Sequence, residues 1–201
     1  MVPNRLYQIG PHTLILPSEH RLDQYQARWR RYDVALGEIS RIIHQQVPDT
    51  CAIDIGANIG DTAALLRKHV PMPVLCIEGH PNFIGLLRTN VARMGPGVEI
   101  ETCFIGQEGG FVDIQRTQAK SGTASVVDAL TSHAPTHAIP VHSLETVLAK
   151  HPRFAQARLV KLDTDGFDFP ILVQSASVLH RLKPVLFFEY DPSFTAQGEA
   201  E

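Results

Sequence analysis

The sequence predicts an α/β fold in which a mainly parallel sheet is covered by helices on both faces. Short apolar segments of strand length alternate with longer segments of helical periodicity, as is typical of strands joined by crossover helices. The strand segments are apolar, as expected of strands buried between two layers of helices. A loop rich in glycine follows the first of these strands and precedes a helix, so the most informative segment lies at the edge where parallel sheets bind ligands.

Two features precede the alternating region. Residues 7–16 alternate loosely around Gly10 and Pro11, which predicts a short hairpin or an edge strand. Across residues 21–46, apolar side chains recur at steps of three and four and form one stripe along a helix or helix pair, with a break near Gly37. We expect the stripe to pack on the sheet, the alternatives being a dimer seam or a lid over the site. The chain is therefore divided into an N-terminal segment, 1–47, and a core, 48–201, within a single domain.

The core elements follow in regular order. We expect strands at 51–55, 73–78, 98–105, 157–163 and 184–190, helices at 61–69, 82–93, 143–150 and 170–180, and a hairpin-like piece near 111–115. Right-handed crossovers with a reversal after the third strand predict the spatial order 3-2-1-4-5. The first and fourth strands are then adjacent, and a ligand should bind beyond their carboxyl ends.

The glycine-rich loop reads Ile53-Asp-Ile-Gly-Ala-Asn-Ile-Gly-Asp61. Gly56 and Gly60 lack a Cβ and allow close approach to a ligand, and Asn58 tolerates left-handed backbone. Asp61 follows Gly60 where a phosphate-binding loop needs lysine, and the glycine spacing differs from the dinucleotide fingerprint. The remaining pattern, with Asp54 at its entrance, suits a positively charged ligand such as S-adenosylmethionine, whose amino group Asp54 is expected to hold directly or through water.

A second acidic residue ends the next strand. Glu78 lies 18 residues after Gly60, close to the offset of roughly 20 residues at which an acidic residue binds ribose hydroxyls. A carboxylate accepts two hydrogen bonds from a vicinal diol, so Glu78 fits any adenosyl ligand.

Three motifs together resemble the FkbM family of S-adenosylmethionine-dependent methyltransferases. They are Asp54-Ile-Gly-Ala-Asn-Ile-Gly60, Glu78-Gly-His-Pro81 with Asn90 following, and Leu159-Val-Lys-Leu-Asp-Thr-Asp-Gly166. The resemblance spans roughly residues 34 to 191 in consistent order. It implies a Rossmann-like class I methyltransferase fold and O-methylation of a hydroxyl on a sugar or natural-product-type small molecule.

The chain departs from the family pattern in three ways. Glu78 is followed by Gly-His-Pro where Glu-Pro is more usual, and Asp163 is followed by Thr-Asp-Gly where Glu-Gly is usual. The chain also stops soon after residue 190, so the C-terminal strands that usually complete such a sheet are expected to be missing. The first two departures leave the cofactor assignment intact but weaken the transfer of details about the acceptor.

The candidate site residues fall into two groups. Cofactor binding is assigned to Asp54, Gly56, Ala57, Asn58, Gly60, Asp61, Thr62, Glu78, Gly79, Ile105, Gly106 and Asp163. Catalysis is assigned to Lys161, Asp163 and His80. Lys161 and Asp163 are two residues apart and share one face of a strand, so a structural ion pair is the alternative to a role at the transferred methyl. Because in-line methyl transfer depends mainly on alignment and exclusion of water, a strong general base is not required.

Other features bear on ligands and loops. Asp163 and Asp165 together with Glu189 offer oxygen ligands for a divalent cation, but our expectation is that no metal is bound. His133 and His137 have metal-ligand spacing, yet Pro135 between them favours a loop. The surrounding stretch, 117–137, is expected either to overhang the site and shape the acceptor pocket or to be a surface excursion.

Composition limits the classes of partner and compartment. The 201 residues are 44% hydrophobic and carry 18 basic against 21 acidic side chains, a net charge of -3 with no basic block. Nucleic acid is therefore not expected as a partner, and no apolar run reaches the length of a membrane span or a signal peptide. Cys51, Cys76 and Cys103 lie in or beside strands without metal-ligand spacing, which predicts buried thiols. We expect a cytoplasmic protein.

Two matters stay open at the level of sequence. The apolar strand 185–190 would leave a hydrophobic sheet edge. The alternatives are coverage by a partner or by a second subunit in a homodimer, coverage by an N-terminal element, or a sequence that is a shortened form of a longer protein. We prefer shortening or a compact variant over a dedicated partner. The expected partner is a hydroxylated small molecule, the methyl acceptor. A module that binds S-adenosylmethionine without catalysis and, less favoured, a nicotinamide-dependent oxidoreductase are the alternative functions.

Overall fold

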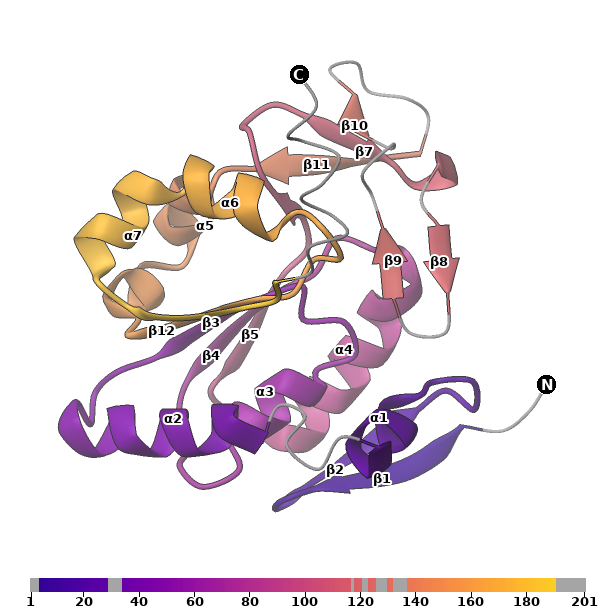
Figure 1. The fold of residues 1–201 in the computed structure, drawn as a ribbon, viewed down its shortest axis with the longest axis vertical. Helices are drawn as coiled ribbons and strands as arrows, with labels where there is room; N and C mark the ends of the chain where they lie inside the picture. Colours follow the sequence, from indigo (N-terminus) through magenta and orange to yellow (C-terminus); the bar gives the residue numbers. More distant parts are fainter. Residues whose placement is uncertain are drawn as a thin grey trace.

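A five-stranded parallel sheet forms the centre of the molecule (Figure 1). The computed structural model describes residues 4–28, 34–116, 118–120, 123–125, 130–131 and 137–190. The strands, in spatial order, are β13 (Val185–Phe188), β12 (Leu159–Leu162), β3 (Ala52–Ile55), β4 (Val74–Ile77) and β5 (Val98–Glu101). All four neighbouring pairs are parallel. This is the predicted order, and the predicted α/β class is confirmed.

Helices cover both faces of this sheet (Figure 1). One face carries α2 (Val34–Gln46), α3 (Asp61–Leu66) and α4 (Pro81–Met94), and the other carries α5 (Leu144–Lys150), the short η3 (Pro152–Gln156), α6 (Asp168–Gln174) and α7 (Ala176–Leu182). The strand period of two sends Ala52 into the first core, whereas Ile53 and Ile55 enter the second. Asp54 lies two residues after Ala52, so it is on the same face of β3 as Ala52 and on the opposite face from Ile53 and Ile55.

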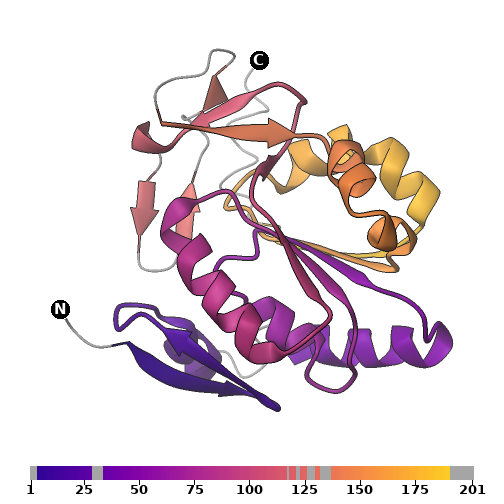
Figure 2. The same cartoon turned by 180° about the vertical axis from the view of Figure 1, so that it is seen from behind.

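The N-terminal segment packs beside α4, as the reverse view shows (Figure 2). It contains an antiparallel hairpin, β1 (Arg5–Ile9) and β2 (His12–Leu16), and the helix α1 (Leu22–Arg28). The hairpin turns at Gly10, which has a positive φ of 53°. The break expected near Gly37 is wrong, because Gly37 lies inside α2, where a Cβ would stand 3.2 Å from the carbonyl oxygen of Leu65. This glycine permits close helix packing rather than ending a helix.

A second, smaller sheet was largely missed. The strand expected at 98–105 is two strands, since the chain leaves β5 at Glu101 and forms β6 (Phe104–Ile105) in another sheet of order β10-β7-β11-β6. Its members are β7 (Phe111–Asp113), followed by the short η1 (Ile114–Arg116), β10 (Leu130–Thr131) and β11 (Ala138–His142). A separate hairpin, β8 (Gln118–Lys120) and β9 (Thr123–Ser125), lies in the stretch expected to be a loop. Nothing predicted β11, whose Pro140 is unusual inside a strand.

Three smaller observations complete the fold. The single helix expected at 170–180 is α6 and α7, which meet at the buried Ser175. Cys51, Cys76 and Cys103 are buried free thiols, as predicted. Within the described ranges, no helix combines the length and the apolar character needed to cross a bilayer.

Candidate active site

A cavity of about 690 Å³ opens beyond the carboxyl ends of β3 and β4. Its walls come from the glycine loop after β3, the turn after β4, the segment 103–110, the loop 163–167 after β12 and the helix α6. Val112 and Val141 of the second sheet close another side. The cavity therefore lies where a ligand site was predicted, and the second sheet supplies a wall that the sequence did not indicate.

Three residues of the glycine loop, at every second position, have positive φ. The φ values are 77° at Gly56, 49° at Asn58 and 91° at Gly60, so the expectation for Asn58 is confirmed. A Cβ on Gly56 would lie 2.0 Å from the carbonyl oxygen of Asp163, so only glycine fits there. The amides of Gly56 and Ala57 both donate to the carbonyl oxygen of Ile77, at 3.0 and 3.1 Å, which fastens the loop to the end of β4.

Glu78 joins the end of β4 to this loop. Its Oε2 accepts from the amide of Asn58 at 2.8 Å, and its Oε1 accepts from the amide of His80 at 2.6 Å. Burial raises the pKa of Glu78 to about 7, although both hydrogen bonds act to lower it. Glu78 lines the cavity, so a carboxylate that titrates near neutrality faces the space where a ligand would lie.

His80 and Gly79 shape the turn that follows Glu78. The Nδ1 of His80 accepts from the amide of Asn82 at 3.3 Å and caps the N-terminus of α4. Burial lowers the pKa of His80, so the ring is neutral near pH 7, and its Nε2 carries the proton because Nδ1 is an acceptor. A Cβ on Gly79 would stand 2.5 Å from the ring of Phe104, so glycine lets that ring pack against the turn.

Lys161 and Asp54 form a buried ion pair behind the cavity wall. The two residues are paired in register across β12 and β3, and Nζ of Lys161 lies 3.1 Å from Oδ1 of Asp54. The same ammonium donates to the carbonyl oxygen of Gly56 at 3.0 Å and lies 3.6 Å from Oδ2 of Asp163. Burial acts to lower the pKa of Lys161, but the facing carboxylates outweigh it and hold the pKa above its ordinary value.

The predicted site residues divide between the cavity wall and the layer behind it. Gly56, Asn58, Glu78, Gly79, His80, Ile105, Gly106 and Asp163 are among the lining residues, whereas Asp54, Ala57, Gly60, Asp61, Thr62 and Lys161 are not. Asp54 was expected to share the cavity with Glu78. It points to the opposite face of β3 from Ile55, which does line the cavity, so its direct contact with a cofactor stays a prediction.

A comparison with family models identifies the fold and its chemistry. The description "Methyltransferase FkbM domain" matches residues 54–200. The chain belongs to the FkbM methyltransferase family. A search of curated proteins finds no match. The matched range contains the glycine loop, Glu78, the second sheet and the end of β12, so the cavity belongs to the methyltransferase domain, whose fold is Rossmann-like and whose activity requires a methyl donor.

Several residues that line the cavity of this FkbM domain were not predicted from the sequence. They are apolar or small polar side chains near the third strand and near α6, chiefly Phe104, Gln107, Thr164, Phe167, Pro170 and Ile171. The signal that was available is the run Gly106, Gly109 and Gly110, which marks an irregular turn beside a strand end. The side chains from α6 carried no local signal, because their position depends on how the helix packs.

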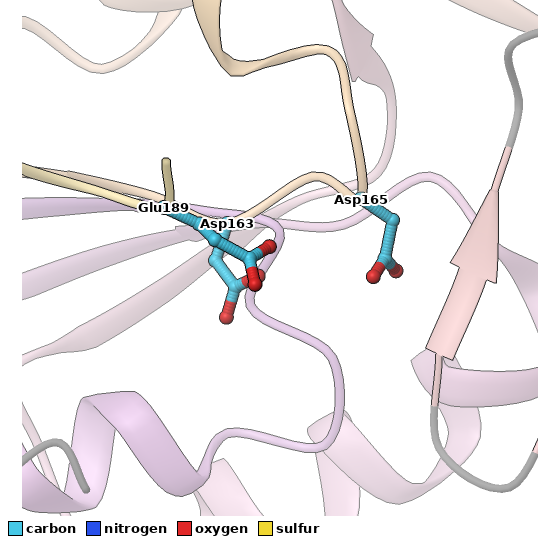
Figure 3. A group of neighbouring side chains, drawn as sticks. All are labelled: Asp163, Asp165 and Glu189. Carbon is cyan, nitrogen blue, oxygen red and sulfur yellow. The ribbon is translucent and has the colours of Figure 1, made fainter. Parts of the chain in front are cut away.

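Asp163, Asp165 and Glu189 approach one another beyond the ends of β12 and β13 (Figure 3). Each offers an oxygen, and these oxygens lie within 4.8 Å of one another, which would permit a shared cation. The Asp163 carboxylate, however, already has the ammonium of Lys161 as a counter-charge. Absence of a bound metal stays our prediction.

Proposed function

We propose that this FkbM-family protein transfers a methyl group from S-adenosylmethionine to a hydroxyl group of a small molecule, of the sugar or natural-product type. The observation that carries the proposal is the position of Glu78, whose buried carboxylate bridges the glycine loop and the cavity. A cavity of about 690 Å³ falls in the range of small-molecule sites, roughly 300 to 1,000 Å³.

The residues around the cavity fit this cofactor. Each oxygen of Glu78 accepts one backbone hydrogen bond and keeps a free lone pair for a ribose hydroxyl. Phe104 and Ile105 provide an apolar wall beside the turn after β4, as a purine requires. Gly56 lacks a Cβ where the loop meets the end of β12, so the loop packs directly on the backbone of Asp163 and keeps that residue beside it. S-adenosylmethionine supplies an electrophilic methyl group on a positively charged sulfur.

The protein's own contribution would be alignment and exclusion of water. Phe167, Ile171, Val112 and Val141 line the cavity with apolar groups, which keeps water from competing with the acceptor. Asp163 has a partly exposed carboxylate at the cavity and is the candidate to accept a hydrogen bond from the acceptor hydroxyl. His80 is less suited to accept a proton, since its Nδ1 already caps α4.

Calorimetric titration of the purified protein with S-adenosylmethionine, S-adenosylhomocysteine and NAD tests the proposal. We expect binding of both adenosyl ligands, weakened by Glu78→Ala by about 1 to 3 kcal/mol, the scale of hydrogen bonds to a charged group. Tight NAD binding without an adenosylmethionine response would overturn the proposal. Cofactor binding without methylation of any compound in a panel of hydroxylated sugars and natural products would instead favour a non-catalytic binding module.

A further inference from the structure

Lys161 connects the buried Asp54 to two residues of the cavity wall, Gly56 and Asp163. Its side chain is 4% exposed, and its Nζ reaches the carboxylate of Asp54, the carbonyl oxygen of Gly56 and the carboxylate of Asp163 at 3.1, 3.0 and 3.6 Å. A protonated lysine has three N–H donors. One of them donates a hydrogen bond to Gly56, and the contacts to the two carboxylates are ion pairs, so the ammonium links the glycine loop to the ends of β3 and β12.

Burying an ammonium group is costly unless its partners are well placed. Asp54 alone would neutralise the charge, and a purely structural pair needs no further contact. The additional hydrogen bond goes to Gly56, the residue whose left-handed backbone begins the glycine loop. Two residues later the amide of Asn58 donates to Glu78, so the orientation of the loop that Lys161 holds also determines how the loop meets the Glu78 carboxylate.

We propose that Lys161 is a positioning residue that holds the glycine loop and Asp163 in the arrangement that binds the adenosyl cofactor. This inference rests on the proposed function and assigns the residue a role within it. Lys161 acts through Gly56 and Asp163 rather than on the substrate, since its ammonium lies behind the described cavity wall. The carboxylates around it keep it protonated, so it is not available as a general base.

A set of four variants separates positioning from simple charge neutralisation. Lys161→Met removes the ammonium and leaves the buried Asp54 without a counter-ion, and Asp54→Asn removes the opposite charge. The double variant Lys161→Met with Asp54→Asn leaves neither charge of the pair. Lys150→Met is the matched control, because Lys150 also pairs with a carboxylate, that of Glu101 at 2.9 Å, but lies outside the cavity.

Hydrogen exchange of the ligand-free protein is the first measurement. The amides of Gly56, Ala57, Asn58 and Gly60 all donate hydrogen bonds in the structure, so their protection reports the order of the loop. We expect the double variant to recover most of the denaturant midpoint lost by Lys161→Met, while these amides exchange at least about tenfold faster than in the native protein. Native protection of the loop in the stable double variant would overturn the proposal.

Should the double variant fail to fold, Asp54→Asn tests whether Lys161 orders the glycine loop. It retains the Lys161 contacts to Gly56 and Asp163, so loop protection relative to helix α5 should stay near that of the native protein. Loss of loop protection in Asp54→Asn would show that Asp54, and not Lys161, orders the loop, which contradicts the inference.

Affinity for S-adenosylhomocysteine is the second measurement. Positioning predicts that the double variant binds this ligand at least about tenfold more weakly than the native protein, whereas Lys150→Met binds it normally. Charge neutralisation alone predicts that the double variant recovers affinity together with stability, and that result would overturn the inference. If the native protein binds no adenosyl ligand, the proposed function fails, and the exchange data alone then decide whether Lys161 orders the loop.

Discussion

The charge on Glu78 should control cofactor binding near neutral pH. Its pKa is raised to about 7 by burial, so the carboxylate is mostly ionised at about pH 8 and mostly protonated at about pH 6. Ribose hydroxyls donate to the ionised form. Affinity for adenosine, which has no group titrating in this interval, should therefore fall about tenfold as the pH is lowered from about 8 to about 6.

Calorimetry at the two pH values checks this expectation, with Glu78→Gln as the control. The glutamine amide does not titrate, so the variant should bind adenosine weakly and equally at both pH values. A native affinity that is independent of pH over this interval would mean that the Glu78 carboxylate does not receive the ribose.

Gly79 is a cavity residue at which a single added methyl group should meet an aromatic side chain. Its Cβ would meet the Phe104 ring at 2.5 Å, so Gly79→Ala should destabilise the protein by about 1 to 3 kcal/mol through overpacking. Gly85→Ala is the matched control on α4, where a Cβ meets nothing within 4 Å and alanine should stabilise the helix by roughly 0.5 to 1 kcal/mol.

Urea denaturation of the two variants gives both values. Adding Phe104→Leu to Gly79→Ala should recover part of the lost stability, because leucine is smaller and can move away from the new methyl group. Equal stability of Gly79→Ala and Gly85→Ala would show that the Phe104 ring moves aside without cost.

The sequence predicted the conformation of single residues well where residue type alone limits the backbone angles. Gly56, Asn58 and Gly60 have positive φ, as residue type indicated. The partner of Asp54 was harder, because the ion pair with Lys161 depends on the register between β3 and β12, two strands more than 100 residues apart in the chain. No local signal specifies that register.

At the level of elements, Asn90 joins the N-terminal hairpin to the glycine loop. Its Nδ2 donates to the carbonyl oxygens of Ile59 and Ile15, at 2.8 and 3.1 Å, and its Oδ1 accepts from the amide of Ile15 at 2.7 Å. Asn90 is fully buried on α4, so Asn90→Ala would leave these backbone groups without partners. We expect a loss of about 2 to 3 kcal/mol in the free energy of unfolding.

Urea denaturation measures this loss, and Thr89→Ala on the same helix is the control. The Thr89 hydroxyl donates to the carbonyl oxygen of Gly85 one turn earlier, and the residue is exposed, so its removal should change stability by about 0.5 kcal/mol or less. A comparably small effect of Asn90→Ala would mean that water replaces the lost side chain.

Elements with strong periodicity were predicted, and those set by tertiary pairing were not. The hairpin β1–β2 and the five core strands followed from apolar patterns and turn residues. In contrast, β11 pairs with β7 through Ala138–Pro140 and with β6 through Val141 and His142. Pro140 is tolerated because the strand changes partner there, and a single sequence does not reveal such an exchange.

At the scale of the whole molecule, connection rules predicted the order of the main sheet. Right-handed crossovers and one reversal leave few alternatives, and β12 duly lies beside β3. The second sheet adds a wall to the cavity without changing that order. The residues that distinguish this domain's ligand cavity therefore come from the inserted strands and α6, whose arrangement no crossover rule constrains.

The edge of the main sheet at β13 is apolar and exposed. Strand β13 pairs with β12 on one side, and Val185, Leu186 and Phe188 remain 44%, 39% and 37% exposed. The rings of Tyr190 and Phe188 both pack against Phe169 and extend the apolar surface. Such an edge offers backbone hydrogen bonds and apolar area to a second copy of the chain, so we expect a homodimer through β13.

Light scattering over a range of protein concentrations measures this association. Phe188→Lys should shift the protein toward the monomer, because a charged side chain on the edge strand opposes pairing. Ile42→Lys is the control, since Ile42 is also exposed, at 46%, but lies on α2 away from the edge. A native protein that stays monodisperse and monomeric at high concentration would remove the edge-mediated dimer, and equal dissociation by both variants would place the contact elsewhere.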